Sequence, residues 1–150
     1  MPDSTRFQQL FAEIDIVASS RFHALQIGDN ISSIPMQISN AKNSLPRVEL
    51  IVIDEWTPSK GQAPRENIEM AQEILELGSD NCSVLILSKS YETQDSAING
   101  PVARGGGKFS EVGAKLWHLT RQRDGNVRHL KTDDELHVLI IENDGFRKRP

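Results

Sequence analysis

Cysteine and aromatic residues are scarce in this sequence. Cys82 is the single cysteine among 150 residues, so an internal disulfide is excluded and a zinc site would lack ligands of the usual spacing. Aromatic residues make up 5% and charged residues 25%, an ordinary balance for a soluble globular protein. The net charge of −4 argues against a wholly basic nucleic-acid-binding surface but leaves room for a local basic patch.

Long apolar runs are missing as well. Runs such as residues 50–53 and 84–87 are far too short to cross a bilayer, and no charged-then-apolar leader begins the chain. We therefore expect no membrane partner and, with one cysteine, a reducing, cytoplasmic location. The length is sufficient for one hydrophobic core, which predicts a single domain over residues 1–150.

Helical and strand-like patterns alternate along the chain. Three stretches with helical spacing of apolar residues begin after Ser4, after Ser32 or Ser33, and at Glu66. The expected strands are residues 22–28, 48–55, 84–87 and 136–141. Between the last two strands lie a long polar loop, residues 91–107, and an Asp-Gly turn that predicts a hairpin over residues 121–128. This order is typical of an α/β protein with a doubly wound, mainly parallel sheet.

The strongest strand signal is the segment VELIVIDE, residues 48–55. Its four consecutive aliphatic residues cannot alternate between core and solvent, so we expect a strand covered on both faces, as in a parallel sheet flanked by helices. Asp54 and Glu55 end this strand, where ligands gather in open α/β sheets. Asp54 could hold a hydrated Mg²⁺ while Glu55 orients or deprotonates an attacking water, the Walker B pattern. Alternatively, the two acids simply open a solvated loop.

Ser88 follows the next buried strand. A hydroxyl in this position could contact a γ-phosphate or the attacking water, and the equal alternative is a serine that opens a loop.

A glycine segment comprises Arg104, Gly105, Gly106, Gly107 and Lys108. It is not a Walker A loop, because Val102 stands where the first glycine belongs and Phe109 follows the lysine. Arg104 and Lys108 could contact nucleic-acid phosphates, with the glycines allowing close approach. The alternative is a plain flexible surface loop. No other stretch has the Walker A spacing.

The succession of these elements, with the acid-ended strand and the glycine segment, resembles RecA-like ATPases across residues 5–146. It is most similar to the DnaB-like replicative hexameric helicases and their plasmid RepA-like relatives. The resemblance implies a RecA-like sheet that lacks its first, Walker A strand. It also implies that Asp54 holds Mg²⁺, that Ser88 is a sensor residue contacting ATP, and that residues 104–108 belong to a DNA-facing loop.

Two functions follow. The first is a RecA-like ATPase of helicase type in DNA replication or recombination, in which Glu55 and Ser88 are catalytic. ATP and Mg²⁺ would then bind only with a phosphate loop from another segment. Its partners would be DNA and either further copies of the chain or a RecA-like partner chain. The second is a non-enzymatic binding or regulatory protein that retains the architecture without ATP hydrolysis.

Overall fold

The computed structural model describes residues 4–26, 30–58, 61–91, 101–123 and 125–149. The chain divides into two compact units. We call residues 27–116 the mixed unit, and residues 1–26 with 117–150 the sheet unit. Among the described residues no helix has the length and apolarity needed to span a membrane. The single-domain and cytoplasmic assignments stay predictions.

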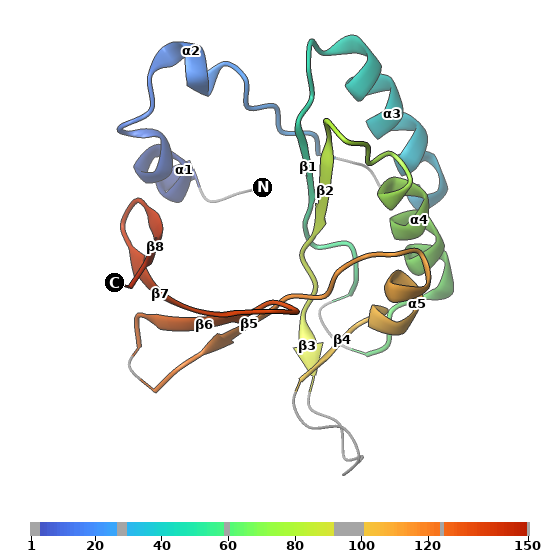
Figure 1. Cartoon of the computed structure of the whole chain (residues 1–150). Coiled ribbons are helices and arrows are strands. Elements are labelled where there is room, and N and C mark those ends of the chain that lie inside the picture. Colours follow the sequence, from blue (N-terminus) through green and yellow to red (C-terminus); the bar gives the residue numbers. More distant parts are fainter. Residues whose placement is uncertain (1–3, 27–29, 59–60, 92–100, 124, 150) are drawn as a thin grey trace. The chain divides into compact units, whose positions relative to one another are not determined.

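The mixed unit contains helices, one parallel pair of strands and one short antiparallel pair. Its elements are η1 (Ile31–Ser33), α3 (Ile34–Ser44), β1 (Leu50–Ile53), α4 (Arg65–Leu75), β2 (Ser83–Ile86), β3 (Ser90–Tyr91), β4 (Val102–Ala103) and α5 (Gly106–Glu111). β1 and β2 run parallel, and β3 and β4 run antiparallel. Figure 1 shows α3, α4 and α5 on one side of the β1–β2 pair.

The core of the mixed unit lies on that helical side. Half-buried residues of the two strands, Ile51, Ile53, Val84 and Ile86, pack against a buried cluster. The cluster consists of Ile38, Trp56, Met70, Ala71, Ile74 and Phe109. Burial of apolar surface in this layer is the main source of stability for the unit.

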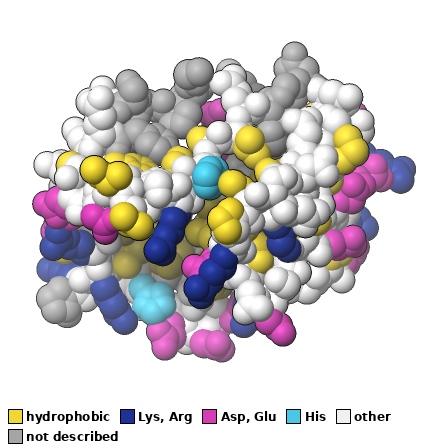
Figure 2. All heavy atoms as spheres, turned by 90° about the horizontal axis from the view of Figure 1, so that it is seen from above, with side chains coloured by type: hydrophobic (Ala, Val, Ile, Leu, Met, Phe, Trp, Pro, Cys, Tyr) yellow, Lys and Arg dark blue, Asp and Glu magenta, His cyan; other side chains and the backbone are white. Residues whose placement is uncertain are grey.

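The opposite face of the β1–β2 pair is apolar and open. Leu50 is 56% exposed, Val52 47%, Leu85 41% and Leu87 45%. These are among the hydrophobic side chains that reach the molecular surface, several of which are visible in Figure 2. β1 therefore alternates between a helix-facing and an open side, instead of being covered on both faces as its sequence predicts.

The predicted doubly wound, RecA-like parallel sheet is wrong. In the described part of the chain, parallel pairing is confined to β1 and β2, and the longest sheet is antiparallel. The reason is that helices cover one face of the parallel pair only. The predicted strand at residues 22–28 is also absent from residues 22–26, while residues 27–29 lie outside the described part.

The sheet unit contains two short helices and a four-stranded antiparallel meander. Its elements are α1 (Ser4–Phe11), α2 (Ile16–Ser19), β5 (His118–Arg121), β6 (Val127–Lys131), β7 (Leu136–Glu142) and β8 (Gly145–Lys148). The strand order is β5-β6-β7-β8. Asp15 caps α2 by accepting a hydrogen bond from Ala18 N at 2.8 Å, which satisfies an otherwise orphan donor. No described side chain of this unit is fully buried.

Several local predictions are confirmed. A helix begins at Ser4, Pro35 lies in the first turn of α3, and β5 and β6 form the predicted hairpin. Basic residues 147–149, which follow the last expected strand and would be expected to form a solvated tail, are instead partly in β8, because Phe146 and Arg147 pair with Ile141 and Ile140. Trp56 is a packing residue, as expected of a tryptophan beside a core.

Candidate functional site

The parallel register of β1 and β2 brings the predicted site residues to one edge. Ile53 lies opposite Ile86, and Leu87 N donates to Ile53 O at 2.9 Å. The chain therefore leaves both strands at the same end. Asp54 and Glu55 follow β1 directly, and Ser88 lies two residues beyond β2. This edge is the candidate site.

Asp54 and Glu55 form a tight, exposed turn. One carboxylate oxygen of Asp54 accepts the Glu55 N–H at 2.8 Å, and Glu55 has a left-handed φ of 51°. Such a conformation is uncommon for a residue other than glycine and typifies turns and functional loops. The turn fixes the direction in which the Asp54 side chain leaves the strand.

Asp54 alone supplies little of a metal site. Mg²⁺ needs six oxygen ligands, of which proteins often provide only one or two carboxylates. No group of three His, Cys, Asp or Glu residues lies close enough to hold a metal among the residues that are described. Asp54 fits Mg²⁺ as one ligand, and the others would have to come from water, phosphate or another chain.

Ser88 connects this edge to the glycine segment. Its hydroxyl lies 3.5 Å from Arg104 O and 3.4 Å from Lys89 O, both long contacts. Arg104 in turn donates from its guanidinium to the carbonyl of Pro58, in the loop that follows β1. The structure thus brings Asp54, Glu55, Ser88 and Arg104 together, although they lie up to 50 positions apart in the sequence.

The glycines of the segment serve packing. Gly105 has φ 69°, and a Cβ there would lie 3.1 Å from the Phe109 ring and 3.3 Å from Trp56. Gly106 is buried, and a Cβ would lie 3.2 Å from Leu116 and 3.3 Å from Ala103. Only Gly107 would meet nothing within 4 Å. Close packing within the protein therefore explains two of the three glycines, and no ligand is needed to account for them.

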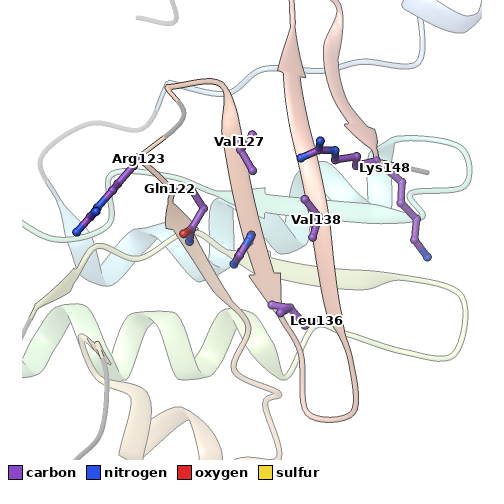
Figure 3. Close-up of a pocket in the computed structure, with 8 residues that line it drawn as sticks. Gln122, Arg123, Val127, Leu136, Val138 and Lys148 are labelled. Carbon is purple, nitrogen blue, oxygen red and sulfur yellow. The ribbon is translucent and has the colours of Figure 1, made fainter.

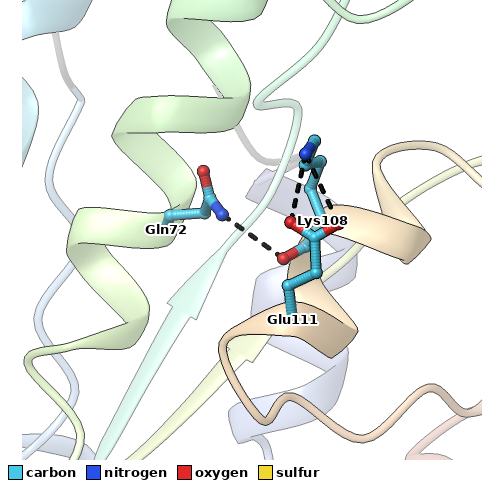
Figure 4. A network of polar contacts seen from close by, with 3 residues as sticks. All are labelled: Gln72, Lys108 and Glu111. Carbon is cyan, nitrogen blue, oxygen red and sulfur yellow. Dashed lines mark hydrogen bonds and ion pairs between the residues drawn. The ribbon is translucent and has the colours of Figure 1, made fainter.

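Lys108 belongs to helix α5 and already has a charged partner. Its Nζ pairs with Glu111 at 3.1 Å, and its carbonyl accepts from Gln72 Nε2 of α4 at 3.3 Å (Figure 4). The predicted loop of residues 91–107 is therefore wrong for its described end, which forms β4, a turn and the start of α5. Residues 92–100 lie outside the described part. The DNA-binding role of residues 104–108 stays a prediction, with both cations engaged.

Asn67 is a buried residue that the sequence reasoning missed. Its side-chain amide donates to the carbonyl of Trp56, and the Trp56 ring packs on Phe109 with centroids 5.2 Å apart. These contacts brace the loop after β1 against α4 and α5. The sequence does indicate that Asn67 is buried, because its helical spacing places it on the same face as Met70 and Ile74.

Comparison with protein-family models and with curated proteins found no match. The function must therefore be argued from the residues. The edge has exposed acidic and hydroxyl side chains on a backbone held by tertiary contacts. Its two cations are already engaged, Arg104 with the Pro58 carbonyl and Lys108 with the Glu111 carboxylate.

Proposed function

We propose that this chain is a DNA-binding protein that does not hydrolyse ATP by itself. The sequence contains no Gly-x-x-x-x-Gly-Lys-Ser/Thr segment to hold the β- and γ-phosphates. Asp54 and Ser88 stand on an exposed edge, and the glycine segment is packed against Phe109 and Leu116 instead of forming a phosphate loop. These features support binding without chemistry.

The observation that carries the proposal is a group of basic residues, most of which pair with no described acid. The stretch from residue 121 to residue 149 contains Arg121, Arg123, Arg128, Lys131, Arg147, Lys148 and Arg149. Of these, Arg147 alone is ion-paired with a described residue. Cations left without acidic partners are those that can neutralise phosphates and release counterions.

Two measurements test this proposal. Fluorescence anisotropy with a labelled 20-nucleotide single strand should show saturable binding at 50 mM salt, whereas calorimetry with MgATP should show no binding in the micromolar range. Absence of DNA binding by the folded chain would refute it. Micromolar, Mg²⁺-dependent ATP binding by the chain alone would refute the non-enzymatic part.

A second candidate is a nucleotide site completed by a partner, the helicase-type function that the sequence resemblance implies. It is favoured by the parallel register that places Asp54 and Ser88 at one edge. In this function Asp54 would contribute one Mg²⁺ ligand and the partner would supply the phosphate loop.

The test uses the complex purified from its natural source. Asp54→Ala should abolish ATP hydrolysis, whereas Asp80→Ala, which removes an exposed acid from the loop before β2, should leave it intact. Equal activities of the two variants would remove this candidate.

A further inference from the structure

The antiparallel sheet carries an open groove with a volume of ≈ 560 Å³. The groove is lined by Gln122, Arg123, Val127, His129, Leu136, Val138, Lys148 and Arg149. None of these residues is acidic. In Figure 3 Arg123 and Lys148 stand on opposite sides of the groove, with Val127 and Val138 between them.

Strand pairing places Val127, His129, Val138 and Arg149 on one surface, whereas Lys148 pairs with Leu139, so its side chain starts on the opposite face of the ladder. His129 of β6 lies directly opposite Val138 of β7, and residues opposite each other in a ladder point to the same face. Arg149 N donates to Val138 O at 2.8 Å, which continues the pairing beyond β8 and aligns Arg149 with Val138. The groove therefore has an apolar floor and a basic margin.

Two nearby acids are engaged by Arg147. Glu142 and Asp144 lie beside Arg147, at 2.7 Å from Nε and in contact with the guanidinium, respectively. The hydrogen bond to Asp144, with the charges of both acids, raises the pKa of Arg147 above its ordinary value. Arg123, Lys148 and Arg149 form no ion pair with another described residue.

We propose that this groove, and not the glycine segment, holds the backbone phosphates of single-stranded DNA. The inference rests on the proposed DNA-binding function and assigns its site. Arg104 donates to the Pro58 carbonyl and Lys108 pairs with Glu111, so the glycine segment has little free charge to offer.

The spacing of the cations favours an extended polyanion over a single phosphate. Arg123 follows β5 and Arg149 follows β8, so three inter-strand steps of about 4.8 Å, or about 14 Å in all, lie between the two sides. One phosphate can contact only one side, whereas successive phosphates of a strand can reach both. The aliphatic floor can contact sugars and bases but offers no hydrogen bonds that would distinguish one base from another. We therefore expect weak sequence preference.

Anisotropy with a labelled 20-nucleotide strand tests the site. About two phosphate contacts, from Arg123 and Arg149, predict a slope near −1.4 for the logarithm of affinity against the logarithm of salt, or about sevenfold weaker binding at 200 mM than at 50 mM. Arg123→Ala and Arg149→Ala should each reduce affinity about eightfold at 50 mM and make the slope shallower by about 0.7. Arg65→Ala removes the same charge from the mixed unit and should bind as the parent does.

The possible outcomes separate the two proposals. If the parent binds DNA and the Arg123 and Arg149 variants bind equally well, the groove is refuted while DNA binding stands. If the folded parent binds no DNA, both fail. Competition by inorganic phosphate at low millimolar concentration, or preferential binding to phosphatidylserine vesicles, would overturn the choice of a DNA strand as the ligand. Circular dichroism of each variant confirms that the fold is retained.

Discussion

Gly105 shows how a single backbone angle can explain a glycine in a sequence motif by packing and not by ligand binding. Its left-handed φ of 69° and its contact with two aromatic rings leave no room for a side chain. The sequence pattern Arg-Gly-Gly-Gly-Lys suggested a flexible phosphate-binding loop, because composition alone does not reveal which glycine is needed for packing. A glycine required by its neighbours is evidence about the fold rather than about a ligand.

We predict that Gly105→Ala destabilises the mixed unit by about 2 kcal/mol or more. The left-handed backbone costs a residue with a Cβ about 1–2 kcal/mol, and the displaced rings add to it. Gly107→Ala is the matched control, because nothing lies within 4 Å of the new methyl group and helix propensity favours alanine by up to about 1 kcal/mol. Urea unfolding measures both. Equal midpoints would show that the turn differs from the one described.

At the scale of elements, β1 illustrates which structural features the sequence predicts and which it does not. The run Leu50–Ile53 was correctly predicted as a strand, and it pairs in parallel with the second predicted aliphatic run. An uninterrupted aliphatic run does not, however, say how many layers cover it. Here Leu50 and Val52 face away from the helices and are exposed. The aliphatic sequence of the strand would be the same if a second layer buried them.

The elements that the sequence does not predict are short or have residues atypical of their secondary structure. Helix α5 begins with two glycines, which are poor helix formers, and is held by Phe109 and by contacts with α4. β8 carries three basic and aromatic residues that suggest a solvated tail, and it forms by pairing with β7. Tertiary contacts decide such segments. The convergence of Ser88 with Arg104 at the candidate site likewise accompanies a short tertiary pairing, that of Ser90 with Ala103 in β3 and β4, which no local pattern predicts.

Substitutions in β1 should reproduce its one-sided burial. Ile53→Ala removes contacts with the helical layer and should cost about 2 kcal/mol, whereas Val52→Ala on the open face should change stability by about 0.5 kcal/mol or less. Chemical denaturation of the full chain gives both values. A similar loss at both positions would mean that the open face is covered in solution, for example by self-association, which sedimentation would detect.

At the scale of the whole molecule, the buried hydrophobic side chains of the described residues are concentrated in one unit. Ile38, Met70, Ala71, Ile74 and Phe109 all belong to the mixed unit, and the described residues of the sheet unit contain none. Resistance to local opening follows buried apolar contacts. The two units should therefore differ in stability even though both are well formed in secondary structure.

Amide hydrogen exchange should reveal this difference. The slowest amides are expected in α4 and in the β1–β2 ladder, and those of β5 to β8 should exchange at least tenfold faster, which corresponds to about 1.4 kcal/mol lower local stability. Saturating the chain with single-stranded DNA should slow exchange in the sheet if the groove binds it. Uniform protection across both units in the free chain would contradict the uneven core.

The connection between β1 and β2 also bears on the order in which the chain folds. The two strands meet only after the loop that contains all of α4 has closed, whereas β5 to β8 pair with their immediate neighbours along the chain. Short loops close at a smaller entropic cost, and local pairings form sooner. The strands that we expect to pair first thus belong to the unit whose described residues include no buried side chain, so this ladder should form early and open readily.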